Sequence, residues 1–383
     1  MMRAPDAADI VVMRVDAASR AREVAGRARE TLRALGVADA ALLEACCVAV
    51  EAMGGRDGDA RMMTDADAGA RARAHPLLVP VAVSASDAHA FVGVCVDGGV
   101  GGGEGGRFGG FFGARGGGSG GAGGAVARSG RRGMTHLASS CELYVRRAMA
   151  ELEREDGGLG ASAEAAEALS RLGVGAYEAG ELARSGLSSR FEVFVTKKIG
   201  RFMDADEALI AAHVKRGDET SALVTAEWHA SGPYLGWARP YATNAATLMR
   251  YGRSIEARDQ ARVALSAGPW WTIGESGELM SRMQTLSGYA GRSAEDARRT
   301  LDGADVDASG APVEEGGKPP TKEELAVKRA TAAMEAVAWG DRADLGWADV
   351  RETVAEAYDE AGLRALSDYV LAPLRAVKRR QTY

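Results

Sequence analysis

The stretch Tyr241–Pro269, YATNAATLMRYGRSIEARDQARVALSAGP, decides the fold that the sequence predicts. Gly252 lies between two runs that are rich in helix-forming residues, and Ala257 follows it five residues later. The stretch ends in a proline, which cannot continue a helix. The pattern predicts two antiparallel helices that reverse at Gly252 and cross closely at Ala257, where a larger side chain would push them apart.

The same arrangement occurs in the preceding stretch. Gly217 lies 35 residues before Gly252 and is followed by Ala222 after the same five residues. A third, less regular copy, GELMSRMQTLSGYAGRSAEDARRTL, repeats the string GRS at 291–293, 39 residues after the GRS at 252–254. A recurring period of roughly 20 to 50 residues is typical of repeat proteins, in which each unit packs on its neighbour.

These copies resemble tetratricopeptide repeats (TPR). Tyr241 matches the aromatic start of the unit and Leu248 a core position. The repeat is defined by small residues at the helix crossings and by glycine or proline where a helix ends: Gly217, Ala222, Gly252, Ala257, Ala261, Ala264 and Pro269. The second half of the chain also looks like a group of TPR-like proteins of green plants and algae, through the strings ARDQARVALSAGPWWTIG and KEELAVKRA.

The resemblance implies an all-α fold of stacked antiparallel helix pairs, a TPR-like α-solenoid that is best defined over 202–301. It also implies a chloroplast protein; a cytoplasmic one is the alternative. In this family the first helices of the pairs line a groove that takes a peptide or a helix. Groove positions carried over to this chain are Asp204, Glu207, Lys215, Arg239, Met249 and Arg250.

The function that follows is a non-catalytic scaffold or assembly factor for protein–protein interaction. The groove arginines would attract an acidic segment or helix of a partner. The alternative is that all six positions are ordinary solvated surface.

A glycine-rich segment, 98–133, divides the chain. Glycine loses the most backbone entropy on folding, and little here can be buried, so we expect a disordered linker. Residues 134–383 are then expected to form the TPR-like helical domain and to fold alone.

The part before the linker is less determined. Residues 1–60 read as a helical hairpin or a targeting-like segment, because Asp16 and Asp39 can cap helices. Residues 61–97 stay open: Leu77–Ser84 and Ala90–Val96 could be strands or irregular chain.

The composition argues against several classes of protein. The net charge is −6, which argues against a basic surface over the whole molecule. The four cysteines form no CxxC pair, so we expect free thiols in a reducing compartment. No apolar run reaches the roughly 18 residues of a membrane span, and the N-terminus lacks a secretory pattern, so we expect no span and no secretion.

Two other functions remain open. The 35-residue period also suits RNA-binding helical repeats, and the glycine tract holds Arg107, Phe108, Phe111, Phe112 and Arg115, which could stack on bases. An enzyme of unrecognised type is the third possibility. The sequence contains no GxSxG or HExxH pattern, and we assign no catalytic residue, metal ligand or cofactor.

Overall fold

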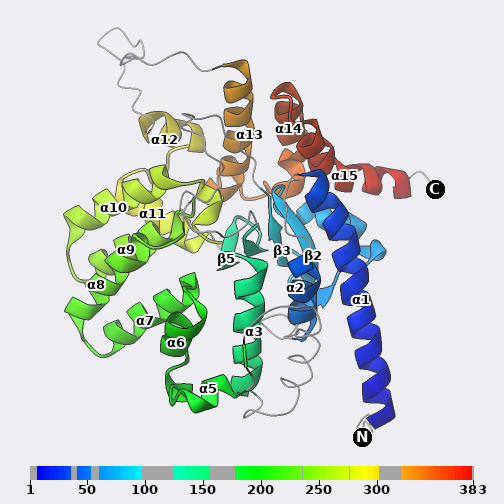
Figure 1. Cartoon of the computed structure of the whole chain (residues 1–383). Helices are drawn as coiled ribbons and strands as arrows, with labels where there is room; N and C mark the ends of the chain where they lie inside the picture. Colours follow the sequence, from blue (N-terminus) through cyan, green and yellow to red (C-terminus); the bar gives the residue numbers. More distant parts are fainter. Residues whose placement is uncertain are drawn as a thin grey trace, which may run out of the picture.

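The computed structural model describes residues 7–35, 41–52, 60–96, 124–155, 177–178, 180–234, 236–275, 277–301 and 321–381. These residues are mostly helical, as the sequence predicts. They also contain a five-stranded antiparallel sheet, so the all-α class is wrong (Figure 1).

The sheet is a meander in which each strand pairs with the next one in the chain. Its strands, in spatial order, are β1 (Ala60–Met62), β2 (Leu78–Ser84), β3 (Phe91–Cys95), β4 (Val126–Ser129) and β5 (Met134–Ala138). Of the two alternatives left open for 61–97, strands are therefore correct. Every residue of β3 is buried, so this strand lacks the alternation of apolar and polar residues that marks a half-exposed strand. Gly93 of β3 has to be a glycine, because a Cβ there would lie 2.2 Å from the carbonyl oxygen of Val79.

The predicted linker is shorter than its glycine content suggests. Strand β4 lies inside the segment 98–133, and Ser129 pairs with Met134 in a tight hairpin. The expected boundary at residue 133 therefore falls between two hydrogen-bonded strands, and the valine and alanine of β4 are buried in the sheet. Residues 98–123 of the predicted linker lie outside the described residues.

Helices before and after the sheet pack on it. The region expected to form a hairpin contains α1 (Ala7–Ala34) and α2 (Ala41–Ala52), which contact each other. A 3-10 helix, η1 (Asp65–Arg73), leads into β2, and α3 (Cys141–Glu155) follows β5 and packs on α2.

An array of short helices follows, in which consecutive helices pack on each other from α7 to α11. The bounds are α5 (Glu181–Arg184), η2 (Ser188–Arg190), α6 (Phe191–Phe194), η3 (Val195–Ile199), α7 (Met203–Lys215), α8 (Glu219–Ala230), α9 (Arg239–Arg250), α10 (Ser254–Ala267), η4 (Trp270–Thr272), α11 (Glu278–Ser287) and α12 (Ala294–Leu301). Three longer helices complete the chain: α13 (Lys322–Trp339), α14 (Trp347–Glu360) and α15 (Arg364–Gln381). Pairing of neighbouring helices agrees with the repeat pattern, whereas a TPR solenoid stays a prediction.

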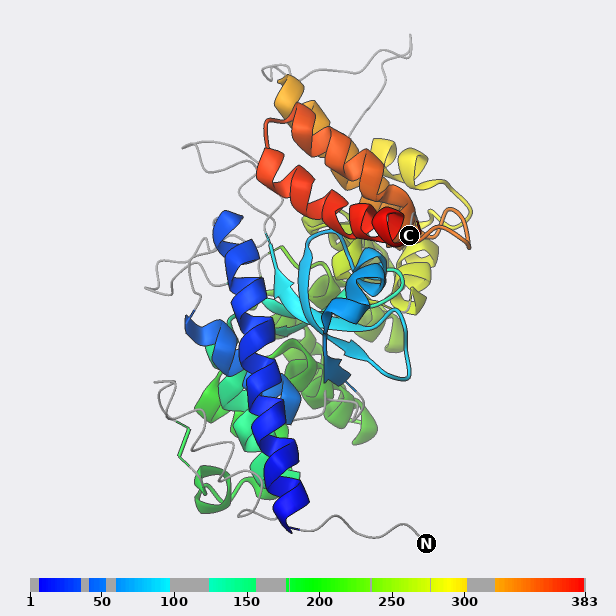
Figure 2. The same ribbon diagram turned by 90° about the vertical axis from the view of Figure 1, so that its right-hand side faces the viewer.

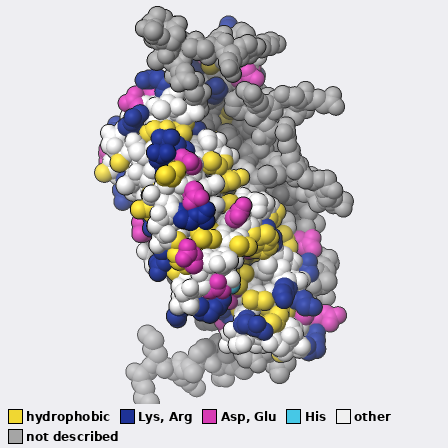
Figure 3. All heavy atoms as spheres, turned by 90° about the vertical axis from the view of Figure 1, so that its left-hand side faces the viewer, with side chains coloured by type: hydrophobic (Ala, Val, Ile, Leu, Met, Phe, Trp, Pro, Cys, Tyr) yellow, Lys and Arg dark blue, Asp and Glu magenta, His cyan; other side chains and the backbone are white. Residues whose placement is uncertain are grey.

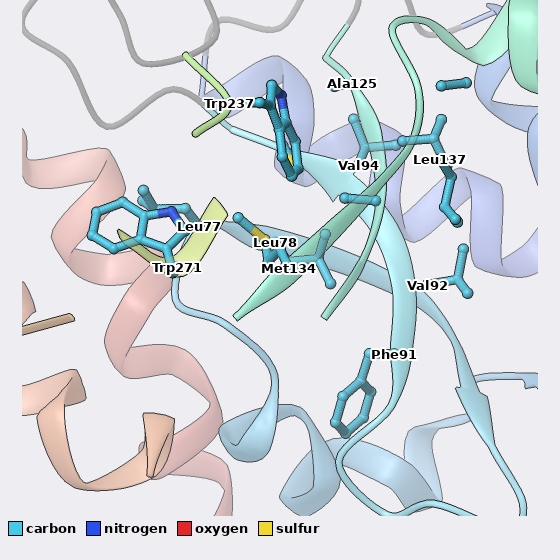
Figure 4. Packing of buried hydrophobic residues seen from close by; sticks show 14 of the residues in the cluster. Leu77, Leu78, Phe91, Val92, Val94, Ala125, Met134, Leu137, Trp237 and Trp271 are labelled. Carbon is cyan, nitrogen blue, oxygen red and sulfur yellow. The ribbon is translucent and has the colours of Figure 1, made fainter. Parts of the chain in front are cut away.

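The sheet lies between the array and the two ends of the chain. Figures 1 and 2 show α7–α10 on one side and α1 on the other, with α14 and α15 near one end of the sheet. Trp237 and Trp271 belong to the same buried cluster as the strand residues Leu78, Val94 and Met134 (Figure 4). The array is therefore not an independent layer: its tryptophans complete the core of the sheet.

Arg351 joins α14 to the first part of the chain. Its side chain is only 1% exposed, and the guanidinium donates hydrogen bonds to the carbonyl oxygens of Ala72 (2.9 Å), Arg71 (3.0 Å), Ala74 (2.7 Å) and Val370 (2.9 Å). Burial lowers the pKa of this guanidinium to about 10. Three of these four acceptors lie in residues 71–74, just before β2, so residues 134–383 share one core with residues 60–96. That residues 134–383 fold alone stays a prediction, and this shared core argues against it.

Candidate protein-interaction surface

The residues that define the repeat lie at the turns and crossings of the helix pairs. Gly217 and Gly252 have φ of 71° and 74°, the left-handed conformation that glycine adopts without a Cβ clash. The alanines Ala222, Ala257, Ala261 and Ala264 have no exposed surface, as close helix crossings require. Pro269 caps η4, directly after α10 ends.

The two tryptophans after Pro269 connect the array to the rest of the chain. Trp270 donates its indole N–H to the carbonyl of Leu265 (2.8 Å), and its ring lies 4.4 Å from that of Trp339 on α13. Trp271 lies 5.1 Å from the ring of His75, which immediately precedes the sheet. Both tryptophans are therefore structural.

Three of the six predicted groove residues are used inside the protein. Glu207 of α7 accepts two hydrogen bonds from Arg239 of α9 (2.6 and 2.8 Å) and one from Thr243 (2.9 Å). Asp204 of α7 accepts a hydrogen bond from Arg147 of α3 (2.7 Å). These side chains hold α7, α9 and α3 together, and a role for them in binding a partner stays a prediction.

The Glu207–Arg239 pair is partly buried. Burial lowers the pKa of Arg239, but the hydrogen bond and the negative charge of Glu207 raise it by more, and the net pKa is raised. Arg128 of β4 makes a similar bridge to Glu275, with a shortest distance of 2.6 Å, and this bridge ties the loop before α11 to the sheet.

A buried polar cluster lies at the junction of α7 and α8, and the sequence analysis did not anticipate it. Asp206 accepts hydrogen bonds from Arg201 (2.7 Å), Tyr234 (2.8 Å) and His229 (3.2 Å). Burial raises the pKa of Asp206, but these three donors lower it by more, so the net pKa is lowered. Asp206 and His229 have no exposed surface, so a substrate cannot reach the pair, and we interpret the cluster as structural. Its members lie up to 33 residues apart in sequence, at spacings that match no known motif.

The other three predicted groove residues are at exposed ends of helices. Lys215 is the last residue of α7, and Met249 and Arg250 end α9. Because an α-helix rises about 1.5 Å per residue, Met249 lies about 15 Å along α9 from Arg239. That Arg239, Met249 and Arg250 bind one partner together stays a prediction.

Large apolar side chains gather on the outer surface of the array. Six large hydrophobic residues of the described chain are classed as exposed, and five of them belong to α8, α9 or α10: Val224 (61%), Trp228 (41%), Met249 (42%), Ile255 (68%) and Val263 (37%). Val224 and Trp228 are four residues apart and share one face of α8. Figure 3 shows hydrophobic side chains interspersed with charged ones on this side of the molecule.

This outer surface has mixed charge. Arg253 pairs with the neighbouring Glu256, and Arg258 lies 3.6 Å from Asp259. Arg201 stacks on the ring of Trp228. We call Val224, Trp228, Met249, Ile255 and Val263 the outer apolar surface. A contiguous exposed apolar surface is typical of sites that bind another protein.

Among the residues that the structure describes, no three or more His, Cys, Asp or Glu side chains are grouped so that they could hold a metal ion. None of the described helices has both the length and the apolar character that crossing a membrane requires.

One family match covers the helices of the array. Residues 203–290, which include α7–α10 and α11, match the family described as PAB middle domain. The chain is also 29% identical over 244 residues to Protein IN CHLOROPLAST ATPASE BIOGENESIS, chloroplastic, of Arabidopsis thaliana, a match that covers 63% of this chain and 67% of the relative. No solved structure matches the chain. The similarity supports a chloroplast location for this protein.

Proposed function

We propose that this chain is a non-catalytic assembly factor that binds a protein subunit during biogenesis of the chloroplast ATPase. The similarity to the Arabidopsis protein, over about two thirds of both chains, is the observation that carries the proposal. The part that matches the PAB middle domain is also the part that carries the outer apolar surface.

The binding surface that we propose is the outer face of α8–α10, in place of the inner groove that the TPR resemblance implies. Asp204, Glu207 and Arg239 at the inner side already bind residues of this chain. Val224 and Ile255 are more than 60% exposed, and an apolar contact with a partner would remove them from water. Lys215 and Arg250 extend this surface at the helix ends, where they would meet acidic residues of the same partner.

RNA binding is the weaker alternative. Two of the exposed arginines of α10 and its N-terminal turn lie beside carboxylates, in the pairs Arg253–Glu256 and Arg258–Asp259. A surface that binds the phosphate backbone needs positive charge in excess. The mixed, partly apolar surface of α8–α10 therefore favours a protein partner.

The proposal is tested by capture from isolated chloroplasts. The bait is the full chain, compared with the double variant Val224→Glu/Ile255→Glu, and captured ATPase subunits are quantified by mass spectrometry. Leu325→Glu is the matched control, because Leu325 is also apolar and 48% exposed but belongs to α13. Both substitutions are on the surface, so melting temperatures should stay close to that of the wild type.

We expect the wild type and Leu325→Glu to capture one or more ATPase subunits, and the double variant to capture much less. If the double variant captures as much as the wild type and Leu325→Glu, the outer apolar surface is not the binding site. Capture of no ATPase subunit by the wild type would contradict the function itself.

A further inference from the structure

A cavity of about 170 Å³ lies on the other side of the sheet from the array. It is bounded by α1, η1, β2, α14 and α15. Neither the family match at 203–290 nor the proposed protein-binding surface involves these elements.

Three arginine side chains line this cavity and no carboxylate does. They are Arg27 of α1, Arg71 of η1 and Arg351 of α14. Arg27 donates to Glu23 (2.8 Å) and to the carbonyl of Met63 (3.0 Å), and the guanidinium of Arg351 is held only by main-chain carbonyls. The cavity therefore carries more positive than negative charge.

Arg71 differs from the other two arginines, whose guanidinium groups make the hydrogen bonds given above. In the part of the chain that the structure describes, its guanidinium has no hydrogen-bond or ion-pair partner, and its Nε atom is buried. A buried donor that is left unsatisfied destabilises the folded state, and an anion would satisfy it. A guanidinium binds carboxylate or phosphate oxygens through two parallel hydrogen bonds.

The rest of the wall is mainly apolar. Side chains such as Val24, Val79 and Pro373 face the cavity from α1, β2 and α15. An engineered apolar cavity of about 150 Å³ binds benzene, so a body of one ring fits the volume here. The cavity thus combines an apolar chamber with a cationic group.

We propose that this cavity binds a small organic anion, consisting of a ring-sized apolar body with one carboxylate or phosphate group, and that Arg71 is the main residue for the anionic group. The apolar body would contact the small side chains of α1 and α15. Arg27 and Arg351 would add positive charge at longer range.

Titration calorimetry with the full-length protein tests this proposal. The probes are phenylacetate and phenyl phosphate, which distinguish the two anionic groups, and phenylacetamide, a neutral analogue of the first. The variants are Arg71→Gln and the matched control Arg73→Gln. Arg73 belongs to the same 3-10 helix, but it does not line the cavity, and its Nε donates to the carbonyl of Ala88 (3.0 Å).

We expect at least one anionic probe to bind and the neutral analogue to bind at least about tenfold more weakly. Arg71→Gln should lower the affinity for the anionic probe by at least about tenfold, which is 1.4 kcal/mol. Arg73→Gln should change the affinity less than twofold. Arg71→Lys, which keeps the charge but not the planar fork, should retain part of the affinity. Absence of binding by both anions, equal binding of the neutral analogue, or unchanged affinity in Arg71→Gln would each overturn the proposal.

Discussion

The substitution Arg351→Met should destabilise the whole protein, although Arg351 is far from the proposed binding surface. Methionine fills much of the same space but donates no hydrogen bond. Four main-chain carbonyls, those of Arg71, Ala72, Ala74 and Val370, would each lose the hydrogen bond from this guanidinium.

The magnitude follows from two opposing terms. Hydrogen bonds from a charged group contribute about 1.5 kcal/mol each at the lower end of their range, or about 6 kcal/mol for four. Burial lowers the pKa of Arg351 from its usual value to about 10, which corresponds to about 3 kcal/mol against keeping the charge in this place. The net loss of unfolding free energy on substitution is therefore about 3 kcal/mol.

Urea denaturation of the full chain measures this loss, and amide exchange locates it. We expect a lower midpoint and faster exchange in η1 and α15. Arg329→Met is the control, because Arg329 is exposed and its ion pair with Glu360 should contribute less than about 1 kcal/mol. If Arg351→Met and Arg329→Met have the same midpoint as the wild type, Arg351 does not join the C-terminal helices to the rest of the protein.

Three further predictions concern the fold. Ala257→Trp should overpack the crossing of α9 and α10 and cost about 1–3 kcal/mol; unchanged thermal melting would contradict that crossing. The fragment 134–383 should not melt cooperatively, because β5 loses β4 and Arg351 loses three of its acceptors; a sharp transition would refute the shared core. Burial lowers the pKa of His136 to about 4, so the folded state resists its protonation. Stability should therefore be complete above about pH 6.5 and fall as the pH drops toward 4. Between pH 7 and pH 5, protonation of this one group should lower the free energy of unfolding by about 2 kcal/mol. Urea titrations at both pH values should show this loss in the wild type and not in His136→Gln.

Local signals predicted the helix pairs, because their determinants are close together in sequence. Gly217 and Gly252 reverse the chain, and Ala222 and Ala257 allow the crossing five residues later. These residues would have the same roles in any arrangement of the pairs, so they do not identify the TPR family by themselves.

The sheet was harder to predict. Strand β3 is buried over its whole length and contains Gly93, and β4 is four residues long and follows a long glycine tract. Neither strand has the alternation of apolar and polar residues that marks a half-exposed strand. The apolar residues of Leu77–Ser84 and Ala90–Val96 allow β2 and β3 to be predicted as possible strands, whereas nothing in the sequence indicates β4.

The groove assignment depended on contacts between distant segments. Position in the repeat placed Asp204, Glu207 and Arg239 on the inner side of the array, but it could not show that α3 and the neighbouring helices already bind them. Likewise, the apolar residues Val224 and Ile255 are unremarkable in sequence, and only the helix packing exposes them.

Direct binding between purified proteins tests the central claim most directly. The full chain is immobilised, and the individual subunits of the chloroplast ATPase are passed over it in turn. We predict that at least one subunit binds, that Val224→Glu/Ile255→Glu weakens its binding by at least about tenfold, or 1.4 kcal/mol, and that Leu325→Glu leaves it unchanged. If no subunit binds the wild-type chain, the proposed assembly function is contradicted; if the double variant binds as tightly as the wild type, the outer apolar surface is not where the partner docks.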